Sequence, residues 1–87
     1  MPNHRSAEKA LRVAERRRLE NVSRKSAMRT ASKKFRLAVA AGQKEQAQAL
    51  LREAISKIDR AAAKRAIHPR QADRRKSRLM KAFQALA

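Results

Sequence analysis

The side chains best suited to chemistry in this 87-residue chain are cations and hydroxyls, and many of them share one side of a predicted N-terminal helix. At 3.6 residues per turn, these side chains lie within about 80° of one direction. This polar stripe consists of Arg5, Lys9, Arg12, Arg16, Ser23, Ser26, Thr30, Lys33 and Lys34. All of these groups donate hydrogen bonds to phosphate oxygens, and the short hydroxyl side chains let a helix backbone approach a phosphate strand closely. Taken alone, the hydroxyls are equally compatible with ordinary exposed residues that bond their own backbone. The collinear cations favour contact with phosphates.

The net charge points to a polyanionic partner. Twenty-four Lys and Arg stand against seven Asp and Glu, which leaves +17. Such a small protein repels itself strongly unless a polyanion neutralises it, and the plausible polyanions are nucleic acid and an anionic membrane. Arg outnumbers Lys by 15 to 9, and its planar fork suits phosphates and base edges. A membrane-surface helix would need Trp, Phe or Leu on its apolar face, where this chain has mostly Ala. No segment has the roughly 18 apolar residues of a membrane span. We therefore predict nucleic acid and no membrane partner.

The acids and histidines do not form a catalytic or metal site in this pattern. Most acids stand three or four residues from a cation on the same predicted helix, as Glu53 does from Lys57. Asp59 has no such partner, so we predict a bridge to an Arg of the third helix. His4 and His68 lack metal-ligand spacing, and His68 is expected to cap the third helix or to contact the partner. The chain has no Cys, and one Gly cannot form a phosphate-binding loop. We predict no enzyme, no catalytic residue, no metal or other cofactor, and no small-molecule substrate.

Gly and Pro divide the chain into helices. The remaining residues are mostly strong helix formers. Ser6 suits the N-cap of the first helix, Gly42 suits the left-handed position after its end, and Pro69 suits the first position of the third helix. The predicted helices span about residues 7–41, 44–66 and 69–86 of a single domain, 1–87.

The apolar pattern predicts an all-α three-helix bundle with a long, overhanging N-terminal helix. The second and third helices carry the three- and four-residue spacing of core-facing helices. These positions are Ala47, Leu50, Leu51, Ala54, Ile55, Ile58, Ala61 and Ala62, then Ala72, Leu79, Met80 and Phe83. In the first helix this apolar spacing is clear only from Met28 onward. Towards the N-terminus, the same face of the helix carries Arg24 and Arg17. Burying those charges unpaired would be costly, so the bundle is predicted to stop near residue 27.

Charge marks the binding elements. Residues 1–42 carry a net charge of +9, residues 43–68 carry +3 and residues 69–87 carry +5. The first and third helices are therefore predicted to bind, with the second as a strut. Besides the polar stripe, the predicted contacts are Arg17, Arg70, Arg74, Arg75, Lys76 and Arg78.

The composition narrows the class of nucleic acid. Only two aromatic residues are present, so there is no platform on which single-stranded bases could stack. Readers of double-stranded DNA usually insert a recognition helix of ordinary length from a compact dimer, and no dimer seam is evident. Shape recognition of folded RNA remains. A non-specific, nucleoid-type packaging protein is the alternative on charge alone.

Two segments resemble a known family. Residues 21–30 (NVSRKSAMRT) and 59–68 (DRAAAKRAIH) are similar to the bacterial small-subunit ribosomal protein S20 family. The resemblance implies a monomeric structural constituent of the small subunit in the cytoplasm, which binds small-subunit (16S-type) ribosomal RNA, including its 5′ domain, directly and early in assembly. Arg65 stands where many relatives have Gly, and Pro69 replaces a basic residue. The RNA contacts implied by the resemblance are Asn3, Ser6, Lys9, Asn21, Ser23, Arg24, Ser26, Arg29, Thr30, His68, Arg74 and Lys76.

Overall fold

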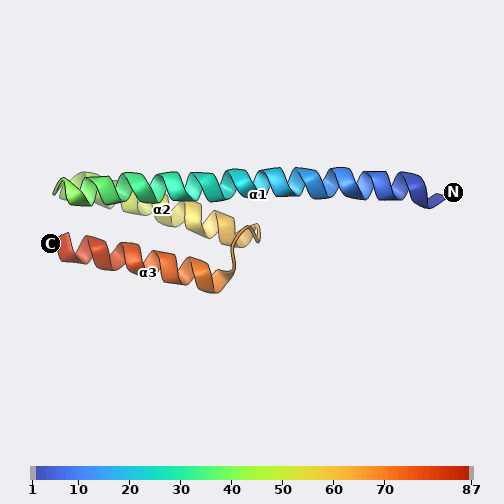
Figure 1. Cartoon of the computed structure of the whole chain (residues 1–87). Coiled ribbons are helices and arrows are strands. Elements are labelled where there is room, and N and C mark those ends of the chain that lie inside the picture. The colour runs from blue at the N-terminus through green and yellow to red at the C-terminus, as the bar shows by residue number, and fades with distance from the viewer. Residues whose placement is uncertain (1, 87) are drawn as a thin grey trace.

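Three helices make up most of residues 2–86, which are the residues that the computed structural model describes, with side chains from residue 5 onward. Helix α2 runs back beside the C-terminal half of α1, and α3 reverses direction again beside α2 (Figure 1). The N-terminal half of α1 extends beyond the other two helices (Figure 1). The predicted all-α bundle with a long first helix is therefore confirmed. The helices are α1 (Pro2–Ala40), α2 (Lys44–Ala63) and α3 (Pro69–Leu86).

Helix α1 begins earlier than predicted. It starts at Pro2 and not near residue 7, so Ser6 lies inside the helix and is not its N-cap. Proline suits a first turn because its fixed φ is already helical and its missing N–H has no partner to lose there. The backbone of Asn3 belongs to α1, but its side chain lies outside the described residues.

The end of α1 is set by Gly42, as predicted. Gly42 adopts φ +71°, and two backbone bonds close the turn. The N–H of Gly42 donates to the carbonyl of Val39 at 3.0 Å, and the N–H of Gln43 donates to that of Ala38 at 3.1 Å. This pair of bonds is a Schellman motif, which satisfies carbonyls that the helix end would otherwise leave free.

Helix α2 ends in the same motif without a glycine. The N–H of Arg65 donates to the carbonyl of Ala62 at 3.0 Å, and the N–H of Ala66 donates to that of Ala61 at 2.8 Å. Arg65 takes the left-handed position at φ +61°. The prediction that this helix reaches residue 66 is wrong, because the reversal at Arg65 ends it at Ala63.

The core is thin and occupies only the bundle. Burial in α1 begins at Met28, as the interruption by Arg24 predicted, and Ser32 is a polar residue that is also buried. Met80 was predicted to face inward but is 43% exposed. Because α3 packs mainly on α2, its buried stripe is narrow, and Leu79 occupies the inward position next to Met80. The buried apolar residues are Met28, Ala31, Phe35, Ala38, Ala47, Ala54, Ile58, Ala61, Ala66, Ile67, Ala72 and Leu79.

The molecule is long and slim, with principal extents of 65, 20 and 14 Å. Helices α1 and α3 both pack mainly on α2 and contact each other little. None of the helices in the described residues is apolar over a sufficient length to cross a membrane.

Candidate nucleic-acid interface

The N-terminal part of α1 presents the basic portion of the polar stripe in the open. None of the described side chains of residues 5–27 is buried; we call residues 5–24 the free half of α1. Arg5, Lys9, Arg12 and Arg16 line one shallow groove along this helix, together with Glu8 and Val13. The structure thus brings together the four cations that the sequence placed on one side. Arg12 and Arg16 make no ion pair with any described residue, so their donors are available to an anion.

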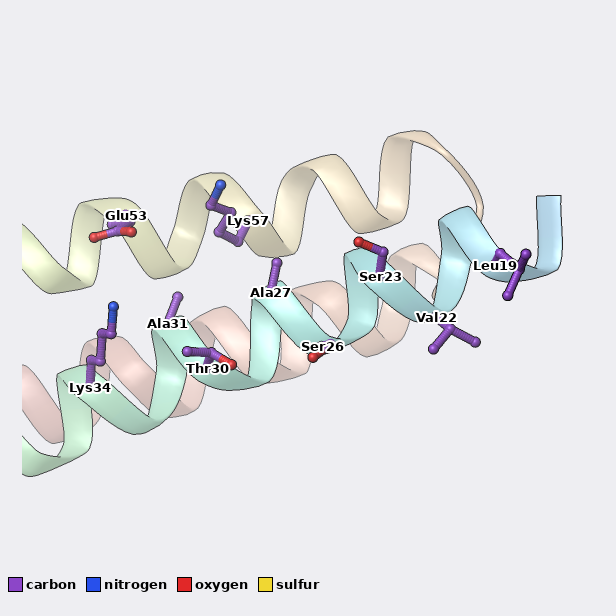
Figure 2. A pocket seen from close by; sticks show the side chains of 10 residues that line it. All are labelled: Leu19, Val22, Ser23, Ser26, Ala27, Thr30, Ala31, Lys34, Glu53 and Lys57. Carbon is purple, nitrogen blue, oxygen red and sulfur yellow. The ribbon is translucent and has the colours of Figure 1, made fainter. Parts of the chain in front are cut away.

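Ser23, Ser26, Thr30 and Lys34 form the second portion of the polar stripe, and they line a different groove. The other wall of this groove comes from α2, which contributes Glu53 and Lys57 (Figure 2). This second portion of the stripe therefore runs beside α2. A phosphate strand that follows the stripe would therefore meet α2 as well. Sequence reasoning missed Lys57, because its position depends on how α2 is rotated against α1.

Three other predicted contacts on α1 are exposed but lie outside both grooves. Arg17, Arg29 and Lys33 have exposed side chains. They make no ion pair with the residues that the structure describes. Neighbouring Arg18, by contrast, donates two hydrogen bonds to Glu15, at 2.7 and 3.2 Å. These bonds, with the charge of Arg18, hold the pKa of the Glu15 carboxyl below its usual value. Arg18 is thus neutralised by its own helix, while Arg17 remains free for an external anion.

Asn21 and Arg24 contact each other at the point where the bundle ends. The Nη1 group of Arg24 donates to Oδ1 of Asn21 at 3.2 Å, and Nη2 lies 3.7 Å from a carboxylate oxygen of Glu20. Arg24 is half-buried. A guanidinium carries five donors, so these contacts leave Arg24 with the capacity to bind a phosphate.

His68 caps α3, which is one of the two roles that the sequence analysis predicted for it. The backbone N–H of Arg70 donates to Nδ1 of His68 at 3.1 Å, and the N–H of Ala72 donates to the His68 carbonyl at 3.1 Å. The imidazole therefore does what a Ser or Asp oxygen usually does at an N-cap. Pro69 occupies the first helical position. Contact of His68 with a partner stays a prediction.

Lys76 joins α3 to α2. Its Nζ lies 2.9 Å from Oδ1 of Asp59 and 3.7 Å from Oδ1 of Asp73. The hydrogen bond to Asp59 raises the pKa of Lys76 above its usual value of 10.5. The predicted bridge from Asp59 to the third helix exists, but its partner is Lys76 and not an Arg. Lys76 is thus largely neutralised within the protein.

The arginines of α3 differ in exposure. Arg70, Arg74 and Arg78 are exposed, whereas Arg75 is half-buried. The Nε group of Arg75 is buried and has no hydrogen-bond partner among the described residues. The exposed arginines therefore form the accessible cationic side of α3.

Comparison with known proteins identifies the family. The sequence model of the family described as ribosomal protein S20 matches residues 2–84. The chain belongs to the ribosomal protein S20 family. It is 56% identical over 86 residues to the small ribosomal subunit protein bS20 of Thermomicrobium roseum, which covers 99% of this chain and 87% of that protein.

Further members agree over the full length. The small ribosomal subunit protein bS20 of Shouchella clausii is 48% identical over 87 residues, covering 100% of this chain and 99% of that protein. That of Mycolicibacterium smegmatis is 49% identical over 86 residues, covering 99% and 100%. The predicted family is confirmed. As a member of the S20 family, the chain is a structural ribosomal protein and not an enzyme, and its location is the ribosome.

Proposed function

We propose that this S20-family chain binds small-subunit (16S-type) ribosomal RNA directly and, as a single copy in the small subunit, stabilises the RNA fold during assembly. The observation that carries the proposal is the free half of α1, whose described side chains are all unburied and which includes unpaired cations. The relatives are named as small ribosomal subunit proteins, which supports the choice of RNA.

The mechanism is charge neutralisation by a rod. RNA strands repel one another through their phosphates, and a cationic helix laid between them removes part of that repulsion. The free half supplies the rod, and the exposed Arg70, Arg74 and Arg78 of α3 dock the bundle. No covalent step is involved.

The structure ranks the predicted contacts by availability. Arg12, Arg16 and Arg17 are exposed and unpaired among the described residues, so they are the strongest candidates. Lys76 is the weakest, because Asp59 and Asp73 already compensate its charge.

The test is binding to the 5′ domain of the host's small-subunit ribosomal RNA at about 0.3 M salt, with excess transfer RNA and duplex DNA as competitors. We expect retained, saturable one-to-one binding. If about eight phosphates are neutralised, the affinity should fall with log salt at a slope near −7. A non-specific packaging protein, the alternative that the charge of +17 supports, would show a similar slope. Transfer RNA and duplex DNA, however, would both displace the ribosomal RNA from such a protein, and that outcome would contradict the proposal.

A further inference from the structure

A cationic hollow lies between α1 and the C-terminal end of α2, the helix that the sequence analysis predicted to be a strut. Its two alanines leave open space that longer apolar side chains would fill. The residues that line it are Arg24 and Ala27 of α1 and Lys57, Arg60, Ala63 and Lys64, of which Lys64 directly follows α2. Four of these six carry positive charge, and no acidic residue lines the hollow.

The charges of this cationic hollow are poorly compensated within the protein. Arg24 has an ion pair with Glu20 at 3.7 Å, but Lys57, Arg60 and Lys64 make none with the described residues. The pair predicted between Glu53 and Lys57 is absent from the ion pairs of the described residues. Cations gathered around one hollow repel one another, and an anion placed among them relieves that repulsion.

Helix capping does not explain the cluster fully. Cations near a helix C-terminus interact favourably with its dipole, and Arg60 lies in the last turn of α2. The last carbonyls, however, already accept backbone bonds from Arg65 and Ala66 in the Schellman motif. Lys57 lies more than one turn before the end of α2, and Arg24 belongs to another helix.

The position of the hollow indicates the anion. Lys57 and Ala27 line the groove of the polar stripe (Figure 2), and both also line the cationic hollow. A phosphate strand lying along the hydroxyl portion of the stripe therefore continues directly into the hollow. We propose that the cationic hollow binds backbone phosphates of the same RNA, which makes α2 an RNA-binding element and not a strut. This inference rests on the proposed function.

The test compares two pairs of substitutions on and beside α2. Arg60→Gln with Lys64→Gln removes two cations from the hollow. Arg52→Gln with Lys44→Gln is the matched control, because it removes one Arg and one Lys from exposed positions of α2 that do not line the hollow. Each pair lowers the net charge of +17 by two. Far-UV circular dichroism and thermal unfolding verify that both variants fold.

The readout is the salt dependence of binding to the 5′-domain RNA. We expect the hollow pair to reduce the magnitude of the log–log slope by about two, and the control pair to leave it nearly unchanged. Raising the salt concentration from about 50 to 200 mM lowers the affinity of both proteins. The factor by which the wild type loses affinity should be roughly ten times larger than the factor for the hollow variant. Equal slopes for the two variants, with specific wild-type binding, would overturn this inference alone. If duplex DNA competed for the wild-type protein as well as RNA does, the proposed function and this inference would both be overturned.

A crosslinking measurement locates the contact. The chain has no Cys, so Ala63→Cys and Gln48→Cys each create a unique attachment point for a photoreactive group. Ala63 lines the hollow and Gln48 does not, although both are exposed on α2. We expect residue 63 to crosslink to one short RNA segment and residue 48 to give little product. Equal crosslinking from both positions, or none from residue 63, would contradict the inference.

Discussion

The C-terminal half of α1 buries Met28, Ala31, Phe35 and Ala38, whereas none of the described side chains of residues 5–27 is buried. One continuous helix thus contains two different surfaces. Packing stabilises the C-terminal half, while the free half relies on its own helix propensity and on side-chain pairs such as that of Glu15 with Arg18. The difference separates the part of the helix that stabilises the fold from the part available for binding. Changes in one half should leave the property of the other half intact.

The largest expected effect is the loss of the bundle in Phe35→Ala. The Phe35 side chain is fully buried, and truncating such a residue costs about 3–5 kcal/mol, which is large for a thin, alanine-rich core. We expect thermal unfolding, followed by circular dichroism, to show a strongly lowered Tm or no folded baseline. Leu11→Ala is the control in the free half, where Leu11 is 71% exposed and its loss should hardly change the Tm. Similar Tm shifts for both variants would refute the division of α1.

The next effect is on binding and not on stability. Arg16→Ala should reduce the magnitude of the salt slope of RNA binding by about one, because an unpaired cation of the free half is lost. Arg36→Ala removes an exposed arginine from the C-terminal half of α1 and should leave the salt slope unchanged. Equilibrium binding at several salt concentrations measures both. If Arg16→Ala left the slope unchanged as well, Arg16 would not belong to the interface.

Stabilisation is expected from Arg65→Gly. Arg65 holds a left-handed backbone at φ +61°, which costs a residue with a Cβ about 1–2 kcal/mol. Glycine adopts this conformation freely, so we expect a gain of about 1 kcal/mol, or about 4–8 °C in Tm for a domain of this size. Arg65→Ala removes the same charge but keeps the Cβ. A comparable rise in Tm for Arg65→Ala would show that charge and not backbone strain is responsible.

The smallest effect concerns the bridge between α2 and α3. Because the pKa of Lys76 is raised above 10.5 by Asp59, its contribution to stability is fully present below pH 10.5 and is lost as the pH rises through the raised value. The pair is partly exposed, with side-chain exposures of 26% and 54%, so we expect about 0.5 kcal/mol. The Tm of the wild type should therefore fall more than that of Asp59→Asn above this pH. Parallel Tm curves would exclude a contribution from the bridge.

The sequence predicted those features that depend on single residues with strong local preferences. Gly42 marked the end of α1, Pro69 marked the start of α3, and Arg24 marked the edge of the core, because each of them is costly in any other environment. The start of α1 was missed because Ser6, a good cap, is also tolerated inside a helix. The left-handed turn at Arg65 carried no glycine signal at its position.

The spatial arrangement of the predicted site residues was anticipated in part for a related reason. Spacing along one helix gives the faces of that helix, so the polar stripe of α1 appears as expected. It does not give the rotation of one helix against another, which decides that Lys57 joins the groove and that Lys76 meets Asp59. Contacts between helices required the structure.

The abundance of alanine in the core determines how thick the protein is. Nineteen of the 87 residues are Ala, and small side chains at a helix contact bring the helix axes close together. The two shorter extents of the molecule are consequently only 20 and 14 Å. If the chain lies between RNA helices, as the proposed function has it, it separates them by little more than its own width. On the same proposal, larger apolar residues in place of the buried alanines would thicken the bundle and increase the distance between the RNA elements on its two sides.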